Sequence, residues 1–437
     1  MSAATRAAQR GRLHLPIERF TLKCGAQLLV SPRPEASVFA VQVHLRGGRA
    51  LDPAGFEGLA HLTGALATEG TEQHTESELA ALLEPTGGSV SGSASGVAGS
   101  VAGSQWKLLL ACLAEVLTTP TYPQERFERQ RARLLARLTV DEDDPRVQVG
   151  RVFRRLIYGD TWLGRPDAGT AQSVQAITRE HLVEHHRQNW VASRALISVC
   201  GNVEPAAVRR ELNRLLGDWK PGEPFETLKL EFPERTTRVG AFTADRQQVH
   251  VLLGHLGIRR SDPDYPALVV MDHILGTGPG FTNRIARRLR DEQGLAYSVD
   301  AQIASSAGRQ PGMFQAYIGT SPDNVETAIE GFLAEIQRMR DTLVSPKELR
   351  LAQDYLTGSF VLGFERSSRR ASYMALAERL GLPEEHLDEL PAQFAAVTRK
   401  SVREAARRHL NPEGLSLATG GPLEASALED LAKRHLG

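Results

Sequence analysis

The stretch Gly58-Leu-Ala-His-Leu-Thr-Gly-Ala-Leu-Ala-Thr-Glu-Gly-Thr71 decides the fold expected for this chain. It follows an alternating apolar segment, Val38–Leu45, and a turn rich in Gly, Asp and Pro at residues 47–55. Alternating apolar residues are typical of a half-buried β-strand, whereas Gly and Pro interrupt regular structure. The sequence therefore predicts a strand, a loop and a helix that begins near Phe56.

The predicted helix resembles the metal-binding helix of the insulinase and mitochondrial-processing-peptidase family of zinc peptidases. In that family, Gly-Leu-Ala-His-x-x-Glu-His is followed by Gly-Thr; the two histidines share one helix face, and the Glu activates the zinc-bound water. Here His61 keeps the first His position, but Gly64 stands at the Glu position and Ala65 at the second His position. Since neither Gly nor Ala can ligate a metal or transfer a proton, the resemblance implies a degenerate motif that holds no metal.

The family's third zinc ligand is a Glu on a later helix, shortly before an acidic stretch that ends in Asp-Pro. In this chain that stretch ends at Asp144-Pro145, and the corresponding position is Arg137. The family's nominal spacing from Ala65 would select Glu142 instead, but spacing varies with loop length, so we favour Arg137. A guanidinium at a ligand position opposes Zn²⁺ binding by charge repulsion. Even with Glu142, the ligand set would lack a third protein ligand and a base.

A basic stripe is predicted on the helix at residues 123–138, where four arginines recur at helical spacing: Arg126, Arg129, Arg133 and Arg137. Residues three and four apart lie on the same helix face. One interpretation is a solvated face paired with Glu125 and Glu128. The other is a positive lining for a substrate chamber.

The segment His181-Leu-Val-Glu184-His185 matches His-x-x-Glu-His letter for letter. It lies on a predicted helix at residues 178–190, in the segment that closes the first half of the chain, far from the family's metal position. No Glu-bearing helix follows at a suitable distance. We therefore interpret the match as a polar helix face, with a rebuilt zinc site as the alternative.

A second family motif lies in the other half of the chain. Gly276-Thr-Gly-Pro-Gly280 precedes a predicted helix ending in Leu-Arg290, and Gly294-Leu-Ala-Tyr297 follows. The family has Leu-Arg and Gly-Leu-x-Tyr here, and its Arg and Tyr reach the active site of the zinc-bearing domain. The resemblance implies that Arg290 and Tyr297 hold a peptide carbonyl and stabilise an oxyanion. The alternative is a surface ion pair for Arg290 and a packed strand position for Tyr297. A phosphate cradle is disfavoured because no Lys accompanies the glycines.

The second half of the chain repeats the first. At one constant spacing, Ile177-Thr-Arg179 recurs as Val397-Thr-Arg399, and Gly201 recurs as Gly421. Both copies are predicted to run from a helix into an apolar strand that ends at Gly, which indicates two homologous domains. Strands and helices mix without regular alternation, which predicts an α+β fold. The resemblance adds that the two α/β sandwich domains form half of a clamshell.

Four parts are predicted along the chain. Residues 1–12 are a disordered extension, 13–218 the N-terminal domain with the degenerate zinc motif, 219–235 a linker, and 236–437 the C-terminal domain with the Arg/Tyr motif. The small-residue run Gly87–Ser104 favours a pair of strands, as in the family, over a flexible linker. The extension contains Ala and Arg but no acidic residue, a composition that is also compatible with a targeting segment.

Composition narrows the function classes. The 437 residues are 41% hydrophobic and 24% charged, as in an ordinary globular protein. Net charge is zero, so no bulk attraction to nucleic acid or anionic membrane is expected. No apolar run approaches the roughly 18 residues that span a bilayer. The cysteines, which are few and far apart, predict reduced thiols in the cytoplasm: Cys24, Cys112 and Cys200.

Some members of the family divide the work between two similar chains, one with the zinc motif and one with the Arg/Tyr pair. The resemblance therefore implies a non-catalytic subunit of a heterodimeric zinc metallopeptidase, inactive alone. Its partner would be a homologous subunit that carries the zinc, and its substrate an unfolded peptide. One alternative is a structural subunit resembling the core proteins of respiratory complexes. Another is an autonomous metallopeptidase with a site rebuilt around His181 and His185.

Overall fold

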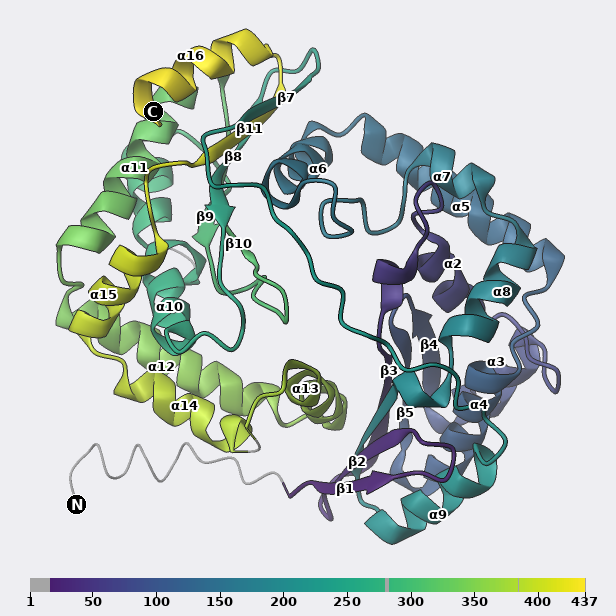
Figure 1. Ribbon diagram of the computed structural model, residues 1–437. Coiled ribbons are helices and arrows are strands. Elements are labelled where there is room, and N and C mark those ends of the chain that lie inside the picture. Colours follow the sequence, from purple (N-terminus) through teal and green to yellow (C-terminus); the bar gives the residue numbers. More distant parts are fainter. Residues whose placement is uncertain (1–15, 280–282, 384, 437) are drawn as a thin grey trace, which may run out of the picture.

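The computed structural model describes residues 16–279, 283–383 and 385–436. The predicted extension at residues 1–12 lies outside the described residues. Each half of the chain forms one mixed β-sheet with helices packed against it (Figure 1). The predicted α+β fold with two domains is confirmed.

The first sheet has six strands in the order β1-β2-β6-β3-β5-β4. β2 and β6 pair in parallel, and the other neighbours pair antiparallel. The central strand β6 is buried along its whole length, so its sequence does not alternate and is apolar or small except for Ser198. The strands are β1 (Glu18–Thr21), β2 (Gln27–Pro32), β3 (Val38–Leu45), β4 (Ser89–Ser93), β5 (Gly96–Ala102) and β6 (Ala195–Gly201).

The second sheet has five strands in the order β7-β11-β8-β10-β9. Here too one pair, β7 and β11, is parallel and the rest are antiparallel. Apart from β1, this order and these directions reproduce the first sheet, which confirms the internal repeat. The strands are β7 (Val239–Thr243), β8 (Val249–Leu256), β9 (Val299–Gln302), β10 (Met313–Thr320) and β11 (Ser416–Gly421).

Most helices pack on the outer faces of the two sheets (Figure 1). Within the described residues, no helix is long and apolar enough to cross a membrane. The first half contains α2 (Leu59–Leu66), α3 (Glu76–Leu83), α4 (Trp106–Thr118), α5 (Gln124–Glu142), α6 (Pro145–Tyr158), α7 (Ala171–Ala176), α8 (Arg179–Asn189) and α9 (Pro205–Leu215). The second contains α10 (Tyr265–Asp272), η5 (His273–Thr277), η6 (Ala286–Glu292), α11 (Val325–Asp341), α12 (Pro346–Gly363), α13 (Ser367–Leu380), α14 (His386–Ala396), α15 (Arg399–His409) and α16 (Ala425–His435).

Two helices cross between the halves. α6 belongs to the first half but packs on β7, β8 and β11, while α13 of the second half packs on β3 and β6. Both helices lie between the two sheets in Figure 1. Hydrogen bonds fasten α13 to its host sheet: the Ser198 hydroxyl donates to the carbonyl of Ala371 at 2.7 Å, and the Ser367 hydroxyl donates to that of Val38 at 2.8 Å. Each half therefore supplies part of the other's core.

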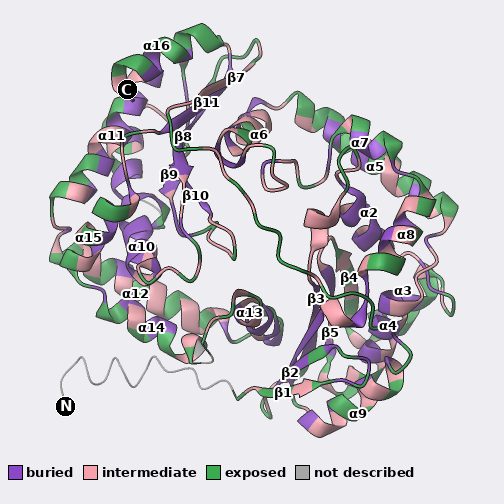
Figure 2. Cartoon of the chain, in the orientation of Figure 1, coloured by how far each residue is buried: buried purple, intermediate pink, exposed green. Residues whose placement is uncertain are grey.

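The small-residue run Gly87–Ser104 forms β4 and β5, as predicted. Glycines are needed here because helices come close to the strands. A Cβ added at Gly99 would lie 2.9 Å from the Leu109 side chain on α4. Figure 2 shows buried residues concentrated on the strands and on α13, whereas the outer helices expose one face.

Phe153→Ala tests the coupling of the halves. The Phe153 ring on α6 is 1% exposed and packs with Leu252 and Tyr317 of the second sheet. Removing it should lower the free energy of unfolding by about 3–5 kcal/mol. Because α6 links both halves, urea denaturation should show one transition shifted as a whole.

Val140→Ala is the matched control, because Val140 lies on α5 and is 70% exposed. It should change the free energy of unfolding by less than about 0.5 kcal/mol. Two separate transitions, of which Phe153→Ala shifts only one, would contradict the coupling.

Candidate functional site

The helix that resembles a zinc-binding helix begins at Leu59 because a half-buried carboxylate anchors its first turn. Asp52 accepts hydrogen bonds from the backbone N–H groups of Gly58 at 3.0 Å and Ala60 at 2.8 Å. These would otherwise be unpaired donors at the helix start. Burial raises the pKa of Asp52 to about 6, although the two hydrogen bonds act in the opposite direction.

His61 is half-buried on α2 beside a cation. Burial lowers the pKa of His61, and the guanidinium of Arg137 lowers it further, while Asp167 acts in the opposite direction. Arg137 of α5 is thus close enough to influence the imidazole electrostatically. No interaction between His61 and Glu142 occurs in the described part of the chain. The imidazole faces a positive charge where a zinc site would need a third carboxylate or imidazole ligand.

Backbone fills the space at the Glu position. A Cβ built on Gly64 would lie 2.0 Å from the carbonyl oxygen of Ser93 in β4, and one built on Gly92 would lie 1.9 Å from the carbonyl oxygen of Gly64. α2 and β4 therefore meet backbone to backbone, and no side chain fits at Gly64 unless β4 moves. With Ala65 at the second His position, the residues present do not fit a zinc ion.

The second half contains the same close approach. His273 stands three residues before Gly276, just as His61 precedes Gly64. A Cβ at Gly276 would lie 2.2 Å from the backbone nitrogen of Ala301 in β9, the strand equivalent to β4. Both halves thus pack a helix glycine on the outer strand of the sheet, and α2 has the packing of a helix without metal chemistry.

The arginines of the basic stripe on α5 pair with other carboxylates than those expected. Arg126 pairs with Glu69 at 3.4 Å and with Glu76 at 3.2 Å, and Arg129 lies 3.7 Å from Glu69. The expected pairing of the stripe with Glu125 and Glu128 is wrong. The face that carries Arg126 and Arg129 turns toward the acidic segment between α2 and α3.

The histidines of the His-x-x-Glu-His match serve separate structural roles. The His181 Nδ1 accepts the backbone N–H of Thr178 at 3.1 Å and completes the cap of α8. His185 is 5% exposed, and burial lowers its pKa to about 4. Glu184 pairs with Arg187 at 2.6 Å. In the described residues, neither histidine belongs to a group of side chains close enough to hold an ion.

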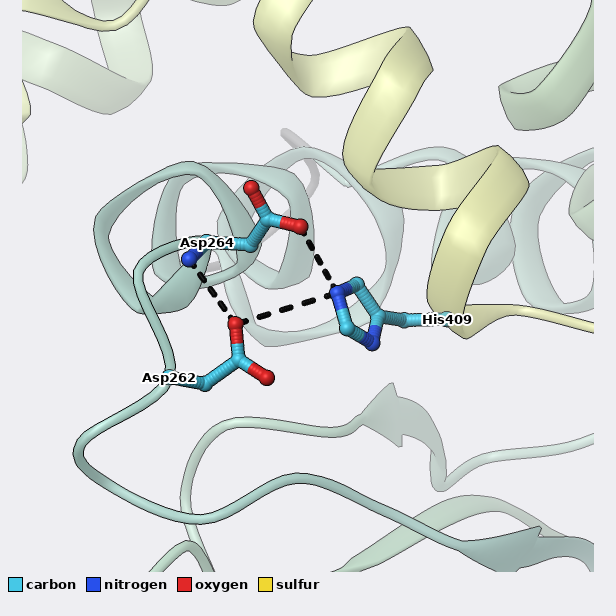
Figure 3. A group of neighbouring side chains, drawn as sticks. All are labelled: Asp262, Asp264 and His409. Carbon is cyan, nitrogen blue, oxygen red and sulfur yellow. Dashed lines mark hydrogen bonds and ion pairs between the residues drawn. The ribbon is translucent and has the colours of Figure 1, made fainter.

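One group that could geometrically hold an ion lies elsewhere, where α10 begins and α15 ends. Figure 3 shows the His409 ring directed at two carboxylates, with Nε2 at 2.8 Å from Asp264 and 3.9 Å from Asp262. Arg408 already donates two hydrogen bonds to Asp264, at 2.7 and 2.6 Å. Because this guanidinium balances the carboxylate, the group is an ion-pair network that ties the two helices together.

The Arg/Tyr pair lies on the surface of the second half. Arg290, on η6, pairs with Asp291 at 2.9 Å. Tyr297 precedes β9 and is 95% exposed, so it is not packed in a strand. The Tyr297 ring therefore contributes nothing to the hydrophobic core. Residues 280–282, which include Gly280 of the preceding Gly-rich segment, lie outside the described range.

Two family models match this chain. "Insulinase (Peptidase family M16)" covers residues 28–170, and "Peptidase M16 inactive domain" covers residues 176–356. The chain belongs to the M16 peptidase family. Among curated M16 relatives, the "uncharacterized zinc protease SCO5738" of Streptomyces coelicolor is 26% identical, over 95% of this chain and 92% of that protein. The "uncharacterized zinc protease YmxG" of Bacillus subtilis is 23% identical, over 93% of this chain and 98% of that protein.

Solved structures share the M16 fold. A peptidase M16 inactive domain from Pseudomonas fluorescens has a TM-score of 0.86 at 23% identity and covers 94% of this chain and 99% of that one. A chain of Complex III2 from Candida albicans has a TM-score of 0.77 at 15% identity and covers 95% and 99%. At these identities the likeness concerns the fold alone.

Sequence reasoning missed two contributors to this M16 helix. Asp52 anchors its start, and an Asp shortly before an expected helix was the available signal. The Gly64–Gly92 contact has no signature in the sequence, because the two glycines lie in separate segments that only tertiary packing brings together.

Gly64→Glu combined with Ala65→His should not create a zinc site. The Glu side chain must displace β4, which should cost about 1–3 kcal/mol or more, and Arg137 would remain beside His61. Metal analysis should find no stoichiometric zinc, and thermal unfolding should occur at a lower temperature than in the parent chain.

Ala65→His alone is the control, since Ala65 is only half-buried and is not in the backbone contact. It should be clearly better tolerated than the double variant. Stoichiometric, tightly held zinc in the parent chain or in the double variant would contradict this account.

Proposed function

We propose that this chain is the non-catalytic subunit of a heterodimeric M16-type zinc metallopeptidase. The observation that carries the proposal is the backbone contact at Gly64, which leaves no room for a catalytic Glu in this chain. The partner would be a homologous subunit with an intact zinc motif, and that subunit would hold the zinc. The substrate would be an unfolded peptide.

Arg290 and Tyr297 would complete the partner's site. A guanidinium offers a fixed fork of donors, and a phenol offers one further donor, so together they can hold a peptide carbonyl. Donors placed at a developing oxyanion stabilise a transition state. The 95% exposure of Tyr297 supports this role, because its hydroxyl is accessible to a bound chain.

The surface of α12 supports association with a partner. Three large apolar side chains on this helix are exposed: Leu351 by 49%, Tyr355 by 48% and Leu362 by 73%. Of its 18 residues, all within the described range, only Ala352 is buried. Exposed apolar groups of this kind mark interaction surfaces.

Two other functions are weighed against this one. A structural subunit is favoured by the fold shared with a chain of Complex III2. An autonomous metallopeptidase would agree with the names of the curated relatives, but the separate roles of His181 and His185 count against it. A cytoplasmic location is proposed because the three cysteines are buried and unpaired.

Co-expression with a homologue that carries the intact motif should yield a stable heterodimer with peptidase activity. The isolated chain should cleave no peptide. Size-exclusion chromatography and peptide cleavage test both points. A chain that stays monomeric in the presence of such homologues would count heavily against the proposal, and homodimerisation alone would favour the structural function.

Tyr297→Phe in the assembled complex should lower kcat by roughly 100- to 1,000-fold, since it removes one oxyanion donor. Assembly and zinc content should stay unchanged. Arg290→Ala should act similarly and also weaken peptide binding. Steady-state kinetics of the purified complex provide the measurement.

Tyr373→Phe is the matched control, because it removes a tyrosine hydroxyl on α13 that accepts a hydrogen bond from Arg260 and belongs neither to the Arg/Tyr segment nor to the α12 surface. It should leave kcat unchanged. If both Tyr297→Phe and Arg290→Ala show normal kinetics, this subunit acts only as a scaffold.

A further inference from the structure

A cavity of about 460 Å³ lies between the two halves of the chain. Its walls come from the end of β3 and the following loop, the β4–β5 turn, the ends of α6 and α13, the segment that joins the halves, and the loop between β9 and β10. The volume falls in the range of roughly 300–1,000 Å³ typical of ligand sites. The cavity can hold a short stretch of peptide.

The charge of the cavity is one-sided. Four arginines line it, Arg46, Arg49, Arg309 and Arg379, and none of the described lining residues is Asp or Glu. The whole chain has 52 basic and 52 acidic residues, so this excess of positive charge is local. Arginine, unlike lysine, presents a planar fork that binds carboxylates through two hydrogen bonds.

Three of these arginines have no side-chain partner among the described residues. Arg49 pairs with Asp167 and lies over the Trp162 ring at 4.9 Å from its centroid. By contrast, the side chains of Arg46, Arg309 and Arg379 make no ion pair or hydrogen bond in the described part of the structure. Arg379 reaches solvent, yet the surrounding protein lowers its pKa, as expected for a group in a concave wall.

His44 lines the same cavity and feels the charges of two of these guanidiniums. It is 8% exposed, and its pKa falls to about 3 because of burial and the nearby charges of Arg379 and Arg46. His44 is therefore neutral at physiological pH and adds no charge. His44, Arg46 and Arg379 all line the cavity, so two like charges gather near one buried ring, an arrangement that a bound anion would stabilise.

Large apolar side chains form part of the other walls. Trp162, Phe225 and Leu228 face the cavity beside the arginines. Inorganic phosphate would leave these surfaces uncovered, whereas a peptide with both carboxylates and apolar side chains would cover them and pair the arginines. We propose that the cavity binds an acidic peptide segment, with its carboxylates on Arg46, Arg309 and Arg379 and its apolar side chains against Trp162 and Phe225. This deepens the proposed function by naming the class of peptide, and it is tested on the isolated chain without any partner.

The test uses two synthetic peptides of equal length, one alternating Glu with Leu and one alternating Lys with Leu. Each carries a fluorescent label and is titrated with the purified full chain by anisotropy. The Glu peptide should bind saturably, and raising the salt from about 50 mM to about 0.5 M should weaken binding strongly. The Lys peptide should not bind.

Arg46→Gln combined with Arg379→Gln should weaken binding of the Glu peptide at least about tenfold. The control is Arg187→Gln combined with Arg210→Gln, two side chains exposed by 63% and 74% on α8 and α9. It should bind as the parent does. Equal unfolding temperatures of the variants would show that binding, not folding, has changed.

Trp162→Phe identifies the place of binding. In the parent chain the Glu peptide should change the intrinsic tryptophan fluorescence, because Trp162 lines the cavity. The other three tryptophans, Trp106, Trp190 and Trp219, lie in or against the core of the first half. Trp162→Phe should abolish this change while anisotropy still reports binding. Equal binding of both peptides, an unchanged affinity in the cavity variant, or binding of tripolyphosphate but not of the Glu peptide would overturn the proposal. Failure to form an active heterodimer would leave it standing, because no partner is involved.

Discussion

The exchange of α6 and α13 between the halves is the constraint on which the rest of the structure depends. Each sheet is covered on one face by its own helices and on the other by a helix from the opposite half. Neither half can then bury its sheet alone, because a sheet with an uncovered apolar face is not stable in water. The exchange also fixes the distance between the halves. The ends of both exchanged helices line the cavity, with Tyr158 at the end of α6 and Arg379 near the end of α13.

A second constraint acts inside the first half, where α2 meets β4. Gly64 and Gly92 allow two backbones to touch, and the same device recurs at Gly276 in the second half. The packing of the helix and its loss of zinc chemistry are therefore linked. In this chain the backbone of β4 occupies the space at the Glu position. A Glu side chain introduced at Gly64 would therefore displace β4 and disturb the fold.

Local pattern predicted much of this fold and little of its long-range pairing. The strand Val38–Leu45 and the internal repeat follow from residue spacing, since turns and periodicity are local properties. The small-residue strands were expected from the resemblance to the family. α6 has a clear apolar face that includes Val149 and Phe153, and this pattern predicts burial but cannot say which sheet provides it. Likewise, Arg126 could be placed on a helix face, but its partners Glu69 and Glu76 lie in segments that only tertiary packing brings near. The site residues Arg290 and Tyr297 came from resemblance to a family, and their roles stay predictions.

The misfit for zinc at Gly64 and the proposed binding of a peptide can coexist because they depend on different parts of one hairpin. Ser93, at the end of β4, fills the position where a catalytic Glu would stand. The next two residues, Ala94 and Ser95, form the turn that lines the cavity. No residue of α2 lines the cavity in the described structure, so closing the space at Gly64 leaves the cavity walls intact. A single hairpin thus closes the metal position on one side and shapes a positively charged cavity on the other. The proposed function, binding a peptide without cutting it, would draw on both features of this hairpin.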